Sequence, residues 1–311
     1  MPSDHSAEPD PGVALLTLRL AAPAKVNLGL RITARRPDGY HEFESVFAPL
    51  DLADEVVLEV SDAPEAAVDF ALASVSAHVP DGTTNLAARA AAGFLAAADL
   101  KHRVSVHLTK RVPAAAGLGG GSSDAGAVLR GLTELLPGAL EPRDLEILAL
   151  GLGADVPYFL APRPSLVSGV GELREPLAAT LSPLVLLLAN PGEALATERV
   201  YAAFDALTPE PAGPGLRELV HRVFEGPGAA GLPELLRNDL EPAAVGLCPA
   251  VARLREALHG AGASAVALSG SGATVFGVFP GFAEAEAALG KLRARTPRRT
   301  WLRVARTLEA G

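Results

Sequence analysis

The 311-residue chain has only one cysteine, Cys248, which excludes an intramolecular disulfide. No apolar run in the sequence approaches the roughly 20 residues that a membrane-spanning helix requires. The seven histidines show no metal-like pairing with carboxylates or thiols, and His102 and His107 are interpreted as surface residues. These shortages point away from a disulfide-stapled domain, a membrane helix and a zinc site.

Basic residues are outnumbered by acidic ones, 27 to 36, so the net charge is −9. Only four of the 27 basic residues are lysines. A deficit of positive charge argues against a nucleic-acid-binding or membrane-surface role. Two of the lysines, Lys25 and Lys110, lie beside the most unusual motifs of the chain. An ammonium group is compact and can reach a single oxygen atom, which favours a specific task at each position.

Residues 110–130 predict a strand, a glycine loop at residues 117–121 and a helix that begins at Ser122 and Ser123. Glycines allow close backbone approach, and a helix N-terminus favours an anion, most often a phosphate. The P-loop pattern fails because Ser122, and not lysine, follows the last glycine, and the dinucleotide pattern fails at the same residue. A serine-hydrolase elbow fails because Asp124 replaces its final glycine. An ordinary flexible loop stays open as the alternative.

The alternation in residues 25–33 predicts a strand on which Lys25, Asn27 and Gly29 share one face. Pro23 either separates this strand from another at residues 15–20 or interrupts one longer strand. The shared face would expose a charged donor beside an amide, and a plain solvated strand face is an equally good interpretation.

Two loops carry further candidate residues. Residues 37–39 are Pro-Asp-Gly, which predicts a tight turn, and Tyr40 and His41 follow it directly. This pair can hold a planar ring, or it is structural. Asp155 lies between small and apolar residues without a basic neighbour in sequence, so it is either buried against a distant partner or catalytic.

The remaining pattern alternates helices and strands. A helix at residues 86–98 has Asn85 as a possible N-cap, and a helix at residues 194–204 places Thr197 and Tyr201 one turn apart. Residues 184–189 are apolar enough to form a central strand. A third glycine cluster, residues 268–276, follows the glycine loop and the short Gly-Leu-Gly step at residues 151–153. It joins two β-like runs and can pack against the first glycine loop.

Three motifs in this order resemble the GHMP kinase superfamily of small-molecule kinases: the Lys25 strand, PAAAGLGGGSS and SGSGATVF. Together with RITARRPDGYHEFESVF and LGADVPYF, they are similar to the branch of that superfamily that phosphorylates a cytidyl-bearing sugar alcohol. The resemblance extends from about Pro23 to Phe279. Alanines at 114–116 occupy positions often given to glycine, and Asp124 replaces a common asparagine.

The resemblance implies an α+β, two-domain GHMP kinase fold with the active-site cleft between the domains. Residues 1–14 would be a disordered tail, residues 15–175 the ATP-binding domain, and residues 176–311 a domain that contributes to the substrate site. It further implies ATP-dependent phosphorylation of the 2-hydroxyl of 4-diphosphocytidyl-2-C-methyl-D-erythritol in the non-mevalonate isoprenoid pathway. Mg²⁺ is expected from this chemistry, but no acidic pair indicates its ligands. We expect a cytoplasmic protein without nucleic-acid or membrane partners.

The resemblance also assigns roles to the candidate residues. Asp155 matches the catalytic carboxylate, and Lys25 matches the lysine beside it. The residues implied to bind substrate are Tyr40 and Tyr201 around the cytosine, His41 at its edge, and Asn27 and Thr197 on the remainder. The residues implied to bind ATP are Asn85, Lys110, Pro113, Gly117, Leu118, Gly119, Gly120, Gly121, Ser122 and Ser123.

Two other functions compete with this one. Another GHMP kinase could act on homoserine or mevalonate, but a Tyr–His clamp is needless for a substrate without a base. A non-catalytic nucleotide-binding module could share the fold, but intact Lys25 and Asp155 argue against it.

Overall fold

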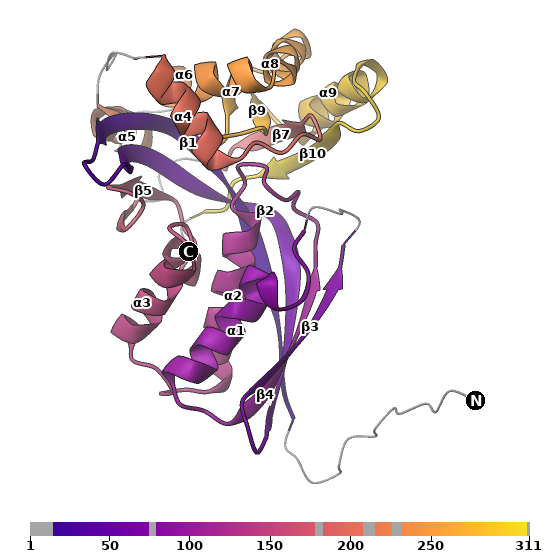
Figure 1. The fold of residues 1–311 in the computed structure, drawn as a ribbon. Helices are drawn as coiled ribbons and strands as arrows, with labels where there is room; N and C mark the ends of the chain where they lie inside the picture. Colours follow the sequence, from indigo (N-terminus) through magenta and orange to yellow (C-terminus); the bar gives the residue numbers. More distant parts are fainter. Residues whose placement is uncertain (1–14, 75–78, 178–182, 208–214, 226–231, 310–311) are drawn as a thin grey trace.

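A computed structural model describes residues 15–74, 79–177, 183–207, 215–225 and 232–309. The expected disordered tail at residues 1–14 lies outside this part of the chain. The ribbon forms two lobes, and the long β1 and β2 strands run from one lobe into the other (Figure 1). None of the helices within the described ranges is both long and apolar enough to cross a bilayer.

The first lobe is built on a six-stranded sheet in the order β3-β4-β2-β5-β6, and β1 pairs with β2. Its strands are β1 (Leu16–Arg35), β2 (His41–Asp62), β3 (Ala67–Ala73), β4 (His102–Thr109), β5 (Ser165–Ser168) and β6 (Leu173–Pro176). The pair β3 and β4 is parallel, and all other pairs are antiparallel. The sequence did not predict β3, because the residues before Pro80 have only a weak pattern.

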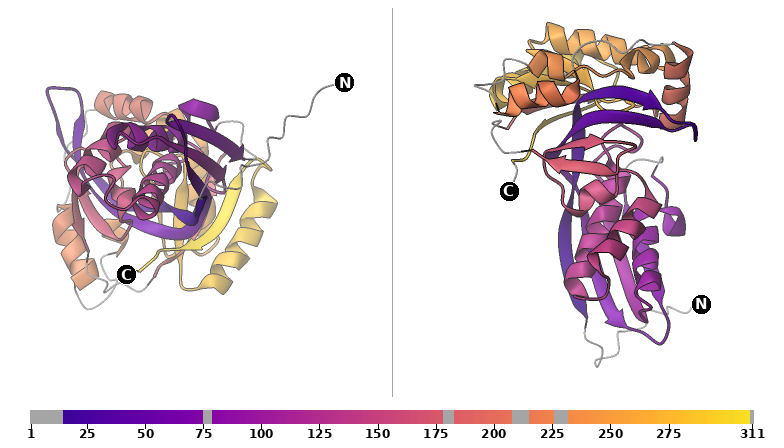
Figure 2. Two further views of the ribbon diagram at one scale, coloured as in Figure 1. Left: turned by 90° about the horizontal axis from the view of Figure 1, so that it is seen from below. Right: turned by 90° about the vertical axis from the view of Figure 1, so that its left-hand side faces the viewer.

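Three helices cover one face of this sheet (Figures 1 and 2): α1 (Leu86–Ala97), α2 (Gly120–Leu135) and α3 (Pro142–Leu152). Alternate residues of β2 and β4 point toward them, so that Val56, Leu58 and Val106 are fully buried. Small alanines on α1 and glycines on α2 let these helices pack closely on the sheet; a Cβ on Gly131 would lie 2.5 Å from Leu58.

The β1 and β2 strands form a continuous antiparallel ribbon, in which the pairing shifts between Pro23 and Lys25. The proline therefore interrupts the register of one long strand and does not separate two strands. The predicted strand at residues 56–60 is likewise only part of the 22-residue β2. The ribbon carries Lys25 and Asn27 at the junction of the lobes.

The second lobe has a four-stranded antiparallel sheet in the order β10-β7-β9-β8. Its strands are β7 (Val185–Asn190), β8 (Ala265–Leu268), β9 (Val275–Phe279) and β10 (Trp301–Arg306). Its helices are α4 (Thr197–Ala206), α5 (Leu216–Val220), α6 (Leu232–Leu235), α7 (Glu241–Leu247), α8 (Ala250–Gly260) and α9 (Phe282–Arg295). The prediction of a central strand near residues 184–189 is confirmed, because β7 lies between β10 and β9.

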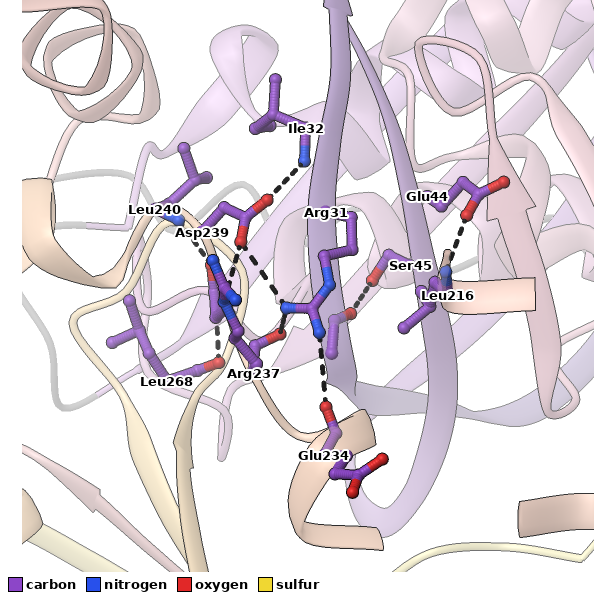
Figure 3. A network of polar contacts seen from close by, with 12 residues as sticks. Arg31, Ile32, Glu44, Ser45, Leu216, Glu234, Arg237, Asp239, Leu240 and Leu268 are labelled. Atoms are coloured by element: carbon purple, nitrogen blue, oxygen red, sulfur yellow. Dashed lines mark hydrogen bonds and ion pairs between the residues drawn. The ribbon is translucent and has the colours of Figure 1, made fainter. Parts of the chain in front are cut away.

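A polar network fastens the second lobe to β1 (Figure 3). The backbone of Leu30 accepts a hydrogen bond from the Asp239 N–H at 3.0 Å and donates one to the Arg237 carbonyl at 3.0 Å. The Asp239 carboxylate accepts from the Ile32 N–H at 3.0 Å and lies 3.5 Å from the Arg31 guanidinium. Asn238 donates to the carbonyls of Leu268 and Gly270, at 3.0 and 2.8 Å. This segment therefore joins β1 to the third glycine cluster and fixes one wall of the cleft.

Candidate active site

A pocket of about 890 Å³ lies where the two lobes meet. The structure brings together most of the candidate residues around it: Lys25, Asn27, Tyr40, His41, Pro113, Gly117, Gly119, Gly120, Gly121, Ser122, Asp155, Thr197 and Tyr201. Four candidates do not line it: Asn85, Lys110, Leu118 and Ser123. The residues that were selected from five separate segments of the sequence thus converge on one cavity.

Lys25 lies beside Asp155 in the lining of this pocket. Its Nζ is 3.6 Å from Asp155 Oδ2, donates a hydrogen bond to Asn27 Oδ1 at 2.8 Å, and lies 4.2 Å from the centre of the Phe47 ring. Burial lowers the pKa of Lys25, and the Asp155 carboxylate opposes that shift. From the sequence, Asp155 was either buried against a distant partner or catalytic. In the structure its partner is Lys25, 130 residues earlier in the chain, and Asp155 also lines the pocket.

The prediction of an exposed polar face on β1 is wrong, because Lys25 and Asn27 are only 4% and 2% exposed. Asn27 is held on several sides: its Nδ2 donates to Ser45 Oγ at 2.8 Å, and its N–H donates to Ser269 Oγ at 3.3 Å. Ser269 comes from the third glycine cluster, more than 200 residues away along the chain. Packing of that cluster over β1 buries a face that would otherwise contact water.

The two glycine clusters pack directly against each other, as predicted. Gly117 has a φ of +75°, and a Cβ there would lie 2.2 Å from the Ser269 carbonyl oxygen. Ser269 Oγ also donates to the Gly117 carbonyl at 2.8 Å. Leu118, whose side chain is buried, accepts a hydrogen bond through its carbonyl from the Lys25 N–H at 2.9 Å. These contacts fix the loop relative to the Lys25–Asp155 pair.

Helix α2 begins two residues earlier than predicted, at Gly120, with Gly119 as its N-cap at a φ of +69°. Ser122 and Ser123 therefore lie within the first turn and do not cap the helix; Ser123 is buried, and Ser122 lines the pocket. No side chain caps this N-terminus. The first N–H groups of a 16-residue helix thus remain available beside the pocket, where they and the helix dipole favour an anion.

Lys110 lies beneath the glycine loop in a buried group of charges. Its Nζ donates to Asp54 Oδ2 and, at 2.6 Å, to Asp124 Oδ2. Asp54 Oδ1 also accepts from the N–H groups of Arg111 and Val112, at the start of the loop. Burial raises the pKa of Asp124 to about 8 despite the opposing charge of Lys110, while both carboxylates outweigh burial and raise the pKa of Lys110.

Asn85 is the N-cap of α1, which confirms the structural interpretation of that residue. Its Oδ1 accepts from the Ala87 N–H at 2.9 Å, and its Nδ2 donates to the Pro80 carbonyl at 2.7 Å. Both ends of the amide are thereby engaged within the protein.

The opposite end of the pocket is rich in rings. Tyr40 is 66% exposed at the turn between β1 and β2, and the ring of His41 lies 4.9 Å from that of Tyr201. His41 Nε2 is 2.7 Å from Asp205 Oδ1. Thr197 Oγ1 lies 3.0 Å from Ser271 Oγ, so α4 also contacts the third glycine cluster. The cleft therefore combines the uncapped N-terminus of α2 with a cluster of rings, and Lys25 and Asp155 line the same cavity.

Comparison with known proteins gives a consistent relationship. Residues 85–162 match the GHMP kinase N-terminal domain, and residues 226–298 match the GHMP kinase C-terminal region. The 4-diphosphocytidyl-2-C-methyl-D-erythritol kinase of Citrifermentans bemidjiense is 41% identical over 84% of this chain and 89% of its own length. The protein of the same name from Anaeromyxobacter sp. strain K is 42% identical over 88% of this chain and 84% of its own.

The chain belongs to the 4-diphosphocytidyl-2-C-methyl-D-erythritol kinases. This family is a branch of the GHMP small-molecule kinases, so the protein is a kinase of the expected fold class. A crystal structure of a 4-(cytidine 5'-diphospho)-2C-methyl-D-erythritol kinase superimposes with a TM-score of 0.76 at 38% identity, covering 94% of this chain and all of the other. Homoserine kinase from Cytophaga hutchinsonii gives 0.70 at 18% identity, covering 94% and 95%, and shares the fold.

Three residues that line the pocket or hold its glycine clusters in place were missed in the sequence. Asp54 replaces a hydrophobic residue at an inward position of β2, between the buried Leu52 and Val56, and that break in the pattern could have identified it. Asp205 follows Tyr201 by four residues, as Tyr201 follows Thr197, so helical spacing could have placed it on the same face. Asn238 gives no local signal, because its partners come from distant segments.

Proposed function

We propose that this enzyme transfers the γ-phosphoryl group of ATP to the 2-hydroxyl of 4-diphosphocytidyl-2-C-methyl-D-erythritol, the reaction of the isoprenoid precursor pathway that is associated with its family. The observation that carries the proposal is the single pocket that joins the Lys25–Asp155 pair, an uncapped helix N-terminus and a cluster of rings. Each feature suits one part of this substrate pair.

Asp155 is suited to act as the general base. It is open to the pocket, with 32% of its side chain exposed, and its carboxylate can accept the proton of the substrate hydroxyl as the new O–P bond forms. The bond from the γ-phosphorus to the bridging oxygen breaks, and ADP leaves with those electrons. Lys25 Nζ, held by Asn27, lies 3.6 Å from Asp155 Oδ2 and presents positive charge to the transferring group.

The phosphates of ATP fit the N-terminus of α2, where backbone N–H groups and the helix dipole supply stabilisation without side-chain charge. We propose that Pro113, Gly117, Gly119, Gly120, Gly121 and Ser122 surround them. Four further residues would shape the ATP site indirectly, since their side chains are buried and do not line the pocket: Asn85, Lys110, Leu118 and Ser123.

Mg²⁺ is part of the proposal because phosphoryl transfer from ATP requires neutralisation of the phosphate charge. Within the described residues no three acidic, cysteine or histidine side chains form a metal cluster. Asp124 is buried against Lys110, so it is not an open ligand. These residues fit an ion that is held mainly by the nucleotide phosphates and water, as Mg²⁺ commonly is.

The aromatic end of the cleft suits the cytosine. We propose that Tyr40 and Tyr201 enclose the base, that His41 hydrogen-bonds its edge, and that Asn27 and Thr197 contact the remainder of the substrate. Smaller alcohols such as homoserine or mevalonate have no group that would use these rings.

We also propose a domain division between residues 175 and 176, which falls at the end of β6, one residue before its last residue Pro176, and ahead of the second sheet, which begins with β7 at Val185. ATP and this one small-molecule substrate are the proposed partners, and the cytoplasm, where ATP is abundant, is the proposed location.

Steady-state kinetics with three acceptors tests the function. The cytidyl substrate should be phosphorylated with a kcat/KM far above that of homoserine or mevalonate. A comparable kcat/KM for either small alcohol would contradict the substrate assignment, and ATP binding without turnover of any acceptor would favour a non-catalytic nucleotide-binding module.

A further inference from the structure

Asp205 joins helix α4 to the turn between β1 and β2. Its Oδ1 lies 2.7 Å from His41 Nε2, and its Oδ2 lies 3.5 Å from Arg35 Nη2. Arg35 is the last residue of β1 and His41 is the first of β2, so one carboxylate contacts both ends of the turn that carries Tyr40. The His41 side chain is 7% exposed and the Asp205 side chain 26% exposed, which shields this contact from bulk water.

The same face of α4 supplies three groups to the pocket. Thr197, Tyr201 and Asp205 are spaced by four residues, and all three line the cavity. The Tyr201 ring lies 4.9 Å from the His41 ring, while the Asp205 carboxylate engages the edge of the same imidazole. The helix therefore fixes both the position and the rotation of the His41 ring.

The contact with Asp205 also determines where His41 carries its proton. An ionised carboxylate can only accept hydrogen bonds, so Nε2 must be the protonated nitrogen in the 2.7 Å contact. In a neutral imidazole the other nitrogen then has a lone pair and acts as an acceptor. Within the described part of the chain no hydrogen bond reaches Nδ1, and this atom is not among the buried polar atoms without a partner. Nδ1 is thus an acceptor available to a ligand in the pocket.

We infer that Asp205 is a positioning residue that makes the site select cytosine over uracil, by holding His41 with Nδ1 as an acceptor. Cytosine presents an amino donor at its C4 position, whereas a pyrimidine with a carbonyl at that position presents an acceptor. The lone pair on His41 Nδ1 can accept a hydrogen bond from the amino group of cytosine. With uracil, the same lone pair would face the lone pairs of a carbonyl oxygen, which is repulsive. The inference rests on the proposed function, because it assigns the aromatic end of the cleft to the base of the substrate.

The first test compares kcat/KM for the cytidyl substrate and its uridyl analogue. The wild type should prefer the cytidyl form, and Asp205→Ala should reduce that preference about tenfold, as expected for loss of one oriented hydrogen bond. The KM for ATP should be unchanged. Asp69→Ala is the matched control, since it removes an exposed carboxylate that is paired with Arg103 on the first sheet, and it should keep the wild-type preference.

The second test measures the tautomer directly and needs no variant of Asp205. Nitrogen chemical shifts of ¹⁵N-histidine-labelled enzyme, recorded at about pH 8 where imidazoles are generally neutral, should show a protonated Nε2 and an unprotonated Nδ1 for His41. The His41→Gln spectrum assigns the resonance. A protonated Nδ1 would overturn the inference, as would a wild type that uses both substrates equally or an Asp205→Ala enzyme with wild-type selectivity. A wild type that phosphorylates neither form with ATP would instead refute the proposed function.

Discussion

The contact between the two glycine clusters predicts a specific cost for adding one methyl group to Gly117. This residue has a φ of +75°, and a Cβ would lie 2.2 Å from the Ser269 carbonyl oxygen and 3.0 Å from the Gly272 carbonyl oxygen. Both neighbours are backbone atoms, so the clash cannot be relieved by rotating a side chain. Gly117→Ala must move one cluster away from the other.

The magnitude follows from two contributions. An alanine in the left-handed region costs about 1–2 kcal/mol, partly offset by the about 0.4–1 kcal/mol gained from a less flexible unfolded chain. Overpacking against fixed backbone adds about 1–3 kcal/mol. Gly138→Ala is a matched control, because its φ is +79° and no atom lies within 4 Å of the added Cβ. The control should lose about 1 kcal/mol and Gly117→Ala about 2–4 kcal/mol.

Denaturant unfolding measures both losses, and the KM for ATP reports whether the loop itself has moved. Gly117→Ala should raise the KM for ATP, whereas Gly138→Ala should leave it unchanged. Equal losses of stability in the two variants, together with an unchanged KM for Gly117→Ala, would refute the argument that this contact positions the phosphate-binding loop.

Three further expectations concern single side chains. Tyr40→Ala should weaken binding of the cytidyl substrate by about 1–3 kcal/mol if stacking dominates, with KM for ATP unaffected; equal losses for both ligands would contradict its placement. Asp54→Asn should lower the free energy of unfolding by about 3–5 kcal/mol. This loss should exceed that of Asp124→Asn, because Asp54 also accepts hydrogen bonds from two backbone N–H groups. Equal losses for the two variants in urea unfolding would disprove this. Burial raises the pKa of Asp124 to about 8, so its contribution to stability is fully present below its unfolded pKa of about 4 and is lost as pH rises through about 8. Wild-type enzyme should therefore lose stability relative to Asp124→Asn as the pH rises from about 4 to about 8, with little further change above that, and a constant difference would exclude the shift.

Local patterns were sufficient to place most of the secondary structure and to single out several of the residues that line the pocket. The helix that follows Asn85, the central strand near residue 187 and the two glycine clusters all lie where sequence patterns predict them. These features depend on short-range rules of capping, alternation and backbone freedom. Ser122, which follows the last glycine of the loop, is also sufficient to distinguish it from P-loops and dinucleotide-binding loops.

Long-range packing accounts for the errors. Lys25 and Asn27 alternate like residues of a half-exposed strand, but the third glycine cluster covers that face and buries both. Asp54, a carboxylate partner of Lys110, was not identified in the sequence, because it lies 56 residues earlier in the chain. Local periodicity cannot predict such partners, because they are brought together by the pairing of β2 with β4 and by the docking of α2 on the sheet.

We propose above all that Asp155 promotes transfer of a phosphoryl group to the 2-hydroxyl of the cytidyl substrate. Mass spectrometry and phosphorus NMR of the product formed with ATP and Mg²⁺ test it most directly, with wild-type and Asp155→Asn enzymes assayed side by side. We expect a product that carries one additional phosphate, at the 2-hydroxyl, and a rate about 10²–10⁴-fold lower for Asp155→Asn. A phosphate at another position, or a variant that retains the wild-type rate, would contradict it.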